Sequence, residues 1–284
     1  MIMLNNNLHT FITAAETGSL TEAAKKLYVS QPAISQAIKK LEEELNVKLF
    51  IRNKRSNLVL TDAGREILTL ANQMYDLENR LYQTAFNENH LMGGIVRIAS
   101  VPLGTSLLLS RVLPIFRSQF PDVKVELFES DPLSVKNMVL NYQADIGIST
   151  SPYLGLEHKL LMMDRMVSID RDRPVKLDLT KDCSDLVFCR VAYESITEQL
   201  KGMDIDLTHS LVVEAASTQI NMVAGGNGTG IISELMLSSI PNELVIGSVK
   251  PEMEMEISLI THDFGELSAA AECVTEMILE RGNV

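Results

Sequence analysis

A polar helix edge near the amino end carries the residues with the clearest chemistry. In the segment 31–45, serine, glutamine and lysine recur opposite a face of apolar residues. Serine and glutamine side chains can hydrogen-bond to base edges, and a lysine ammonium can neutralise a phosphate. This edge therefore indicates contact with the major groove of DNA. The residues expected to make that contact are Ser30, Gln31, Pro32, Ser35, Gln36 and Lys39.

Two helices around a tight turn must position this edge. Ser19 can cap the first helix, and Glu22 three residues later completes a capping box. Ser30 can cap the second, and Pro32 fits its first turn, where no backbone donor is needed. The pattern predicts a helix-turn-helix, with an ordinary helical hairpin and a solvated polar face as the alternative. Apolar spacings of four, three and four define the buried face of the second helix, namely Ile34, Ile38, Leu41 and Leu45.

A basic hairpin follows the second helix. Residues 49–51 and 58–60 are predicted to pair as strands around a polar, turn-forming tip at 52–57. Such a wing is suited to phosphate or minor-groove contact. Its expected DNA-binding residues are Arg52, Lys54 and Arg55.

The run from Phe11 to Gly64 resembles the N-terminal winged helix-turn-helix of the LysR-type transcriptional regulators. Asn46 stands where that family usually has glycine, but asparagine also tolerates the left-handed conformation of a helix C-cap. The resemblance implies a sequence-specific regulator that binds double-stranded operator or promoter DNA and is controlled by a small-molecule effector. The matching pieces are Gly18-Ser19, Ala23-Ala24, Leu27, Ser30-Gln31-Pro32-Ala33, Ser35, Leu41-Glu42, Leu49-Phe50, Arg52 and Leu60-Thr61.

Charge is divided unevenly along the 284 residues, whose formal net charge is −12. Residues 1–61 hold eight Lys/Arg and five Asp/Glu, a balance of +3, and the remainder holds 17 basic and 32 acidic residues, a balance of −15. An acidic body is repelled by duplex DNA, which confines contact to the basic head. The chain has neither an export signal nor an apolar run of roughly 18 residues, so we expect a cytoplasmic protein with no membrane partner.

The residue spacing does not favour metal, cofactor or catalytic chemistry. Three cysteines are too few for a disulfide framework, and no CxxC motif, Cys/His cluster or nucleophile triad occurs. We therefore expect no enzyme, no cofactor and no metal site. Cys183 and Cys189 lie six residues apart, and some LysR-type relatives sense oxidants through a cysteine pair. Buried or incidental thiols are the alternative.

A long helix is predicted after the wing. Thr61 can cap a helix from Asp62 to about Glu88. Its apolar spacings alternate between four and three, which is typical of a two-helix coiled contact. We expect it to pair with the same helix of a second subunit, in a homodimer or tetramer; packing against its own C-terminal domain is the alternative. The seam consists of Ala63, Ile67, Leu70, Met74, Leu77 and Leu81.

Strands alternate with helices from residue 95 onward. The series over 95–149 predicts a parallel sheet with helices on both faces. A second unit follows, with strands expected at 166–169, 186–191, 211–214, 230–233 and 254–260. Helices are expected at 194–201 and 218–224, before a closing helix at 267–279. This layout resembles the effector-binding domain of the LysR-type family, which is similar to the periplasmic solute-binding proteins.

The predicted fold is an all-α winged helix-turn-helix with a long linker helix, followed by an α/β two-lobed periplasmic-binding-protein-like domain. The expected boundaries are 1–61 for the DNA-binding domain, 62–91 for the dimerisation helix and 92–284 for the effector-binding domain. Within the last, lobe I covers 92–163 and 263–284, and lobe II covers 164–262.

The segment GGNGTG at 225–230 is glycine-rich, as phosphate-binding loops are. It lacks the lysine and Ser/Thr of a P-loop and follows a predicted helix, where a dinucleotide-binding loop would follow a strand. A turn between helix and strand is therefore favoured over a nucleotide site.

A small ligand of such a fold binds between the lobes, at the carboxyl ends of parallel strands. Hydroxyls and free helix amides there suit a carboxylate or another polar metabolite, with Arg190 as counter-charge unless it pairs with the acidic surface. A solute-binding protein and an α/β enzyme remain as other hypotheses, although the first leaves the head unexplained and the second lacks a site. The stretches expected to reach the cleft are 100–105, 149–151, 190–195 and 217–218. Within them, the expected effector-binding residues are Ser100, Pro102, Thr105, Ser149, Thr150, Arg190, Tyr193 and Thr218.

Overall fold

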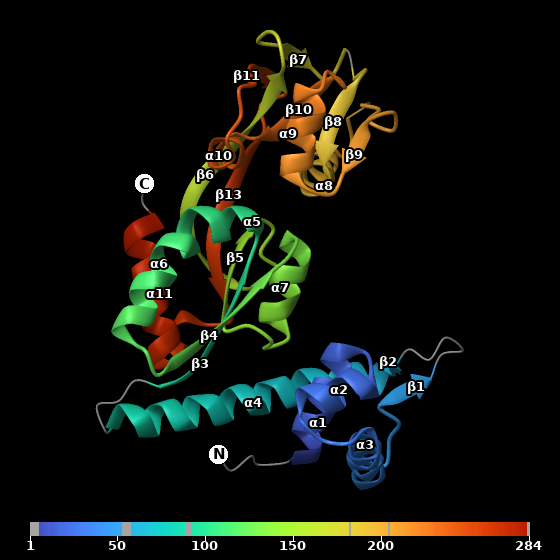
Figure 1. Cartoon of the computed structure of the whole chain (residues 1–284), viewed down its shortest axis with the longest axis vertical. Helices are drawn as coiled ribbons and strands as arrows, with labels where there is room; N and C mark the ends of the chain where they lie inside the picture. Colours follow the sequence, from blue (N-terminus) through green and yellow to red (C-terminus); the bar gives the residue numbers. More distant parts are fainter. Residues whose placement is uncertain (1–5, 53–57, 89–92, 182, 204, 283–284) are drawn as a thin grey trace.

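A helical head, a long helix and two α/β lobes form the chain in the computed structural model (Figure 1). The structure describes residues 6–52, 58–88, 93–181, 183–203 and 205–282. The long helix lies between the head and the lobes, and the two lobes follow one another along the long axis of the molecule.

Three helices and a hairpin make up the head. Its helices are held by the predicted caps, since the Ser19 hydroxyl accepts from the amide of Glu22 and the Ser30 hydroxyl from that of Ala33. Phe11 and Ile34 are fully buried between the helices. The elements are α1 (Asn6–Thr17), α2 (Leu20–Lys26), α3 (Gln31–Leu45), β1 (Phe50–Arg52) and β2 (Leu58–Leu60).

The wing is tied to the end of α3 by a carboxylate. Glu42 accepts hydrogen bonds from the amides of Leu49 and Phe50 and from the Lys48 ammonium. Burial opposes ionisation of Glu42, but these hydrogen bonds outweigh it and lower its pKa. Asn46 has φ 55°, so asparagine does supply the left-handed cap. The head is not all-α, because β1 and β2 form the predicted hairpin, shifted by one residue at β1.

Helix α4 (Asp62–Glu88) has two contrasting sides. It begins where predicted, with the Gly64 amide donating to the Thr61 hydroxyl at 2.8 Å. On one side Ala71 and Asn72 are buried, and the Asn72 amide donates to the carbonyl of Asn141 in lobe I. The helix thus packs on its own body, as the alternative interpretation expected, yet much of the predicted apolar seam is exposed. The exposed seam residues are Leu70, Met74, Leu77 and Leu81.

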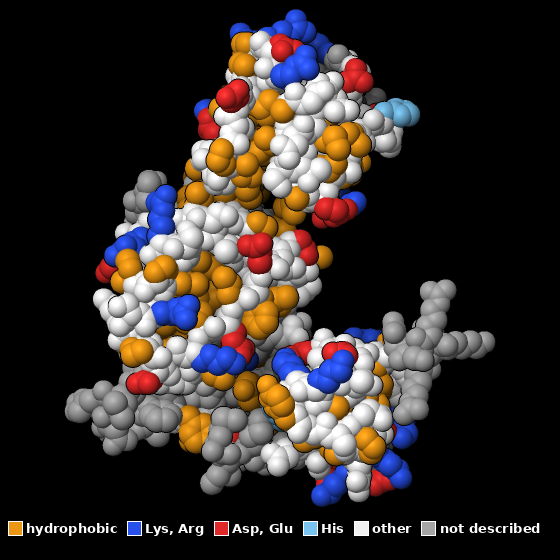
Figure 2. Space-filling view, viewed as in Figure 1, with side chains coloured by type: hydrophobic (Ala, Val, Ile, Leu, Met, Phe, Trp, Pro, Cys, Tyr) orange, Lys and Arg blue, Asp and Glu red, His pale blue; other side chains and the backbone are white. Residues whose placement is uncertain are grey.

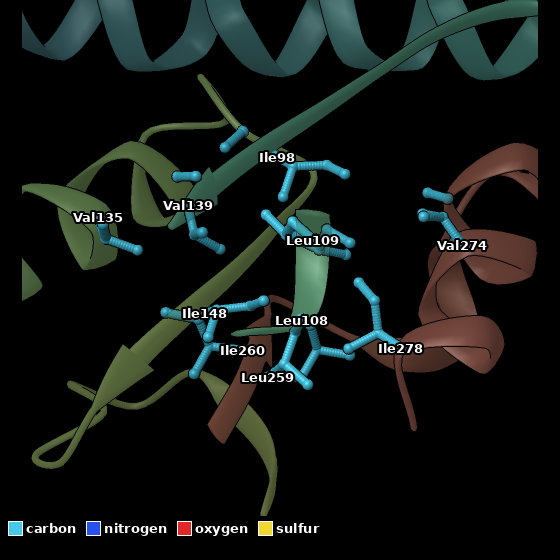
Figure 3. Packing of buried hydrophobic residues seen from close by; sticks show 14 of the residues in the cluster. Ile98, Leu108, Leu109, Val135, Val139, Ile148, Leu259, Ile260, Val274 and Ile278 are labelled. Atoms are coloured by element: carbon cyan, nitrogen blue, oxygen red, sulfur yellow. The ribbon is translucent and has the colours of Figure 1, made fainter. Parts of the chain in front are cut away.

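The first lobe contains the predicted parallel strands. β3 (Gly94–Ser100) lies between β4 (Val123–Glu129) and β5 (Ile146–Thr150), and all three run parallel. α7 (Pro132–Leu140) covers one face of this sheet, while α6 (Ser110–Gln119) and α11 (Ala269–Gly282) cover the other (Figure 1). Buried aliphatic side chains from the strands and both helix layers meet in the core, as Figure 3 shows for Ile98, Ile148, Val139 and Val274. The helix predicted from Thr105 starts earlier, with a short turn at Pro102–Gly104 and a π-helical stretch at Thr105–Leu109.

Two long antiparallel strands join the lobes. β6 (Glu157–Asp170) pairs with β13 (Glu254–Thr261) along the whole length of β13. Within the described residues, nine strands form one sheet with the path β4-β3-β5-β13-β6-β10-β8-β9, and β11 pairs with β6 beside this path. β6 extends well beyond the predicted strand at 166–169, because its first half is largely exposed and gives little apolar signal. The expected lobe boundary at 163/164 falls inside it.

The second lobe contains β7 (Lys176–Asp178), α10 (Glu234–Ser239), β11 (Val245–Ile246) and β12 (Ser248–Lys250), which the sequence did not predict, and one predicted helix begins earlier than expected. α8 (Arg190–Gln199) begins four residues before the predicted helix at 194–201, directly after β8 (Leu186–Cys189). Arg190 and Tyr193 are therefore helical. The remaining elements are β9 (Leu211–Val213), α9 (Ala216–Ala224) and β10 (Thr229–Ser233).

The glycine-rich segment forms the expected turn between α9 and β10. Gly228 has φ 117°, and a Cβ atom there would clash with the carbonyl oxygen of Asp185. Only glycine permits both this backbone conformation and this close approach. The backbone conformation and the close approach of Asp185 therefore explain the glycine at 228 without a bound phosphate.

No helix in the described parts of the chain has both the length and the apolar character needed to cross a bilayer.

Candidate nucleic-acid interface and effector cleft

The polar edge of α3 is open to solvent. Gln31, Pro32, Gln36 and Lys39 are exposed, and Ser35 is half-buried. Ser35 and Lys39 border a groove of about 310 Å³ between α3 and the hairpin, whose other wall includes Phe50 and Leu58. An exposed edge beside a groove can meet the donors and acceptors of base edges.

Two of the predicted head residues have partners of their own. The Ser30 hydroxyl caps α3, so its side chain is engaged before any ligand arrives. The Lys39 ammonium lies 3.5 Å from Glu43, but both side chains are exposed and such a pair contributes little. Lys39 can therefore exchange Glu43 for a phosphate.

The wing is described only in part. Arg52 is the last residue of β1, and Lys54 and Arg55 lie outside the described residues. Their predicted phosphate contacts stay predictions.

Tyr28, at the turn between α2 and α3, is a candidate that sequence reasoning missed. Its side chain is 96% exposed, and its backbone has the left-handed φ of 56°. A bulky residue rarely adopts this conformation, and the side chain of Tyr28 gains almost no burial here. The signal in the sequence was an aromatic residue three positions before the first residue of α3.

A cavity of about 370 Å³ lies between the two lobes. The surface is hollowed there, beside the strands that join them (Figure 2). Lobe I contributes Pro102 and Thr150, the joining strands contribute Met166 and Ile257, and lobe II contributes Ala216 among others. The complete lining is Val101, Pro102, Leu103, Glu129, Pro132, Thr150, Met166, Cys189, Val191, Ala192, Ser195, Glu214, Ala215, Ala216, Ser217, Ile232, Ser233, Met236, Ile240, Met255 and Ile257.

The structure brings Pro102 and Thr150 of the predicted effector set to this cavity and places two others beneath its surface. Ser100 and Ser149 are fully buried. The Ser100 hydroxyl donates to the carbonyl of Val101, and the Ser149 hydroxyl donates to that of Pro132. Both serines therefore hold the backbone of lobe I rather than face the cavity.

The remaining predicted residues lie outside the lining. Thr105 borders a different groove, next to α6. Arg190 is exposed and pairs with Glu214 at 2.8 Å, the surface alternative that the sequence left open. Tyr193 packs against Phe188, and of the expected stretch 217–218 only Ser217 lines the cavity. The early start of α8 accounts for Arg190 and Tyr193, because a helix turns successive side chains by about 100°.

Sequence reasoning missed most of the lining. Its apolar residues come from elements between Val101 and Ile257, and they carry no shared motif. The predicted stretches at strand ends contribute some lining residues, among them Val101, Leu103 and Val191, but the methionines and isoleucines of the lining lie outside those stretches.

The cysteines lie in settings that favour the thiol. Burial raises the pKa of Cys189, and the Cys183 thiol donates to the carbonyl of Leu179 at 3.1 Å. All three cysteines, which lie within the described residues, are thiols rather than disulfides. Among the described residues, no group of His, Cys, Asp and Glu could hold a metal ion.

Comparison with known families gives the identity of this arrangement. Residues 5–65 match the family "Bacterial regulatory helix-turn-helix protein, lysR family", and residues 89–283 match "LysR substrate binding domain". The chain belongs to the LysR family.

Similar proteins agree over nearly the whole chain of this LysR-family member. The uncharacterized HTH-type transcriptional regulator YoaU of Bacillus subtilis is 40% identical over 278 residues, covering 95% of this chain and 96% of YoaU. A full-length OxyR variant of Pseudomonas aeruginosa matches with a TM-score of 0.70 at 20% identity, covering 100% of this chain and 96% of OxyR. Full-length CbnR complexed with its target DNA has a TM-score of 0.62 at 21% identity, covering 98% and 100%.

The LysR-family chain is thus a transcriptional regulator with a helix-turn-helix DNA-binding domain and an α/β effector-binding domain. It is not an enzyme.

A buried ionic joint connects the two parts of this LysR regulator. Arg97 on β3 donates to Asp76 of α4 at 2.8 Å and to Asp145 at 2.6 Å. It also donates to the carbonyl of Tyr142 at 2.9 Å. Burial, reinforced by the charge of Asp145, raises the pKa of Asp76 to about 6. The contact between α4 and the effector domain therefore contains a carboxyl that titrates near neutral pH.

Replacing Asp76 by asparagine is expected to change how stability depends on pH. The ordinary pKa of 3.8 is raised to about 6 in the folded chain, so the proton stabilises the fold. This contribution is fully present below about pH 4 and is lost as pH rises through 6. We expect the melting temperature of Asp76→Asn, relative to wild type, to rise by about 5 °C between pH 4 and 7.

The melting temperatures of Asp76→Asn and of wild type are measured by thermal unfolding between pH 4 and 7. The difference between the two is compared across pH, because the protonation of other residues affects both proteins equally. Asp263→Asn, an exposed carboxylate near the same joint, serves as the control and should show a flat difference. Parallel pH profiles for Asp76→Asn and wild type would contradict the assignment.

Proposed function

We propose that this regulator contacts operator DNA through the exposed edge of α3. Gln31, Pro32, Ser35 and Gln36 face base edges, and Lys39 neutralises a phosphate. The observation that carries this proposal is the open polar edge, held at its amino end by the Ser30 cap. Arg52, Lys54 and Arg55 of the wing act on the backbone, and Tyr28 joins them because its exposed phenol can donate to a phosphate.

Two copies of the chain present two such edges. The exposed stripe of α4, defined as Leu70, Met74, Leu77 and Leu81, supports pairing with the same helix of a second copy. The opposite side of α4 is already packed on its own lobe I, so the stripe is the part left for a partner. The resulting homodimer or tetramer places two heads on two half-sites.

The effector of this regulator occupies the cavity between the lobes. Both lobes and the joining strands β6 and β13 contribute to one lining, so a bound molecule contacts both lobes at once. A ligand that binds one relative arrangement of the lobes more tightly shifts the population toward it. We retain 1–61, 62–91 and 92–284 as the functional divisions.

A gel-shift assay tests base contact by the α3 edge. Gln31→Ala or Ser35→Ala is expected to weaken binding to an operator selected from random duplexes by about 10-fold, because one good base contact contributes about 1–3 kcal/mol. Binding to a scrambled duplex should change by less than about two-fold, since phosphate contacts supply non-specific affinity.

Gln119→Ala serves as the matched control, because Gln119 is an exposed glutamine on α6 of lobe I. It should leave both affinities unchanged. Equal losses on operator and scrambled duplex would contradict base contact by Gln31 and Ser35. Absence of operator binding at both low and high salt would contradict the proposed function itself.

A further inference from the structure

We propose that the effector is an apolar amine: a molecule with an aliphatic or aromatic body and one ammonium group. The inference rests on the proposed function of the inter-lobe cavity and names the chemical class that this cavity fits. It replaces the carboxylate or other polar metabolite expected from strand ends.

The apolar lining of the cavity indicates that the body of the ligand is apolar. Three methionines, three isoleucines, two valines and three alanines contribute to the lining. Methionine is flexible and polarisable, and it packs well around irregular apolar shapes. A cavity of about 370 Å³ lies at the lower end of the size range for small-molecule sites. These walls stabilise a compact apolar body by removing its surface from water.

The sign of the charge follows from the ionisable residues. Among the described residues that line the cavity, the charged side chains are Glu129 and Glu214, with no lysine, arginine or histidine. Arg190 lies outside the lining and is already paired with Glu214. Lys136 is buried and donates to the carbonyl of Thr150 at 3.1 Å, but it too is outside the lining. A carboxylate would thus enter next to Glu129 without a lining cation to pair with it, and it could bind Arg190 only by displacing Glu214.

Helix ends are the features that could favour an anion. Ala215 precedes α9 without a side-chain cap, so the first amides of that helix are available to a ligand oxygen. Val101 likewise precedes α5 without a side-chain cap. Each helix end carries about half an elementary charge, whereas Glu129 carries a full one and an ammonium that displaces Arg190 gains that of Glu214 as well. The balance at the cavity favours a cation, and the amides can serve an uncharged oxygen on the same ligand.

The two glutamates line the cavity from different lobes. Glu129 ends β4 of lobe I, and Glu214 follows β9 of lobe II. An ammonium between them attracts both lobes, and it competes with Arg190 for Glu214. Binding of the ammonium by both glutamates therefore draws the two lobes together. In this way the amine would shift the population toward the arrangement in which the lobes are closer.

Matched ligands on the full-length chain test the proposal. The probes are 3-phenylpropylamine, 3-phenylpropanol and 3-phenylpropanoate, with hexylamine, hexanol and hexanoate as a second body. Thermal shift and calorimetry should show the amine binding at least about 10-fold more tightly than the alcohol, and the carboxylate binding most weakly. Glu129→Gln should reduce amine affinity about 10-fold and leave alcohol affinity unchanged.

Two further arms locate the binding. Ala215→Phe, at an exposed lining position, should abolish amine binding while operator binding in the gel shift persists. Glu157→Gln, an exposed carboxylate outside the lining, is the control and should leave amine affinity unchanged.

Several outcomes would overturn the inference: tighter binding of the carboxylates, no binding of either amine, or amine binding that survives Ala215→Phe. If one of these outcomes is found while operator binding is intact, the amine class of ligand is rejected and the proposed function stands. Loss of operator binding in the unmodified chain rejects the proposed function, whichever ligand binds.

Discussion

Arg97→Met is expected to destabilise the chain by about 3–5 kcal/mol, the cost of breaking a buried ion pair from one side. Arg97 is 6% exposed and bridges Asp76 and Asp145, so its removal leaves two carboxylates close together without a counter-charge. Methionine keeps much of the apolar stem, which isolates the loss of the guanidinium. Urea unfolding at pH 7 measures the effect.

Arg80→Met is the matched control for that measurement. Arg80 also joins α4 to lobe I, through Glu266 at 3.5 Å, but Glu266 is largely exposed. A surface pair contributes at most about 1 kcal/mol, and the charge of Arg80 affects Asp76 less than that of Arg97 does, so this variant should lose far less stability than Arg97→Met. Adding Asp76→Asn to Arg97→Met should recover part of the loss, because it removes one of the stranded charges. Equal destabilisation by the two arginine variants would contradict the proposed joint.

Leu77→Glu is expected to convert the oligomer to monomers and to lower operator affinity by at least about 100-fold. Leu77 is 58% exposed in the middle of the α4 stripe, and a carboxylate there would be desolvated against its own copy across a two-helix contact. Linking two heads multiplies affinity by about 10²–10⁴ over a single head, and that gain is lost with the pairing. Light scattering and a gel shift on an operator with two half-sites measure both effects.

Leu133→Glu provides the comparison, because Leu133 has the same 58% exposure on α7, away from the stripe. It should keep the oligomeric state and the operator affinity of wild type. On a duplex with one half-site, Leu77→Glu should bind almost as well as wild type, which shows that the head is intact. An oligomer that persists in Leu77→Glu would place the partner elsewhere and remove the role proposed for the stripe.

The head and the long helix are the parts that local sequence signals determined. Ser19, Ser30 and Thr61 cap helices as predicted, and Asn46 adopts the left-handed conformation expected of it. Caps and apolar periodicity act within a few residues along the chain, so they are visible without the fold. The first three strands of lobe I and their helices follow from the same kind of signal.

The cleft and the ionic joint were decided by tertiary structure. Thr105, Arg190, Tyr193 and Thr218 follow strands as a ligand site requires, yet each lies outside the inter-lobe lining. Sequence order shows that a residue follows a strand, but not which way its side chain points once α8 begins at Arg190.

Arg97 is a second residue whose role the sequence does not reveal. In the sequence it is one basic residue in an apolar strand, and its role depends on Asp76 and Asp145, which are 21 and 48 positions away. Local hydrogen bonds and periodicity thus determined the helices, the first strands and the DNA-binding head. Packing between distant segments decided which charges meet, which side chains face the cleft and which side of α4 stays open, because those energies depend on distances that only the folded chain sets.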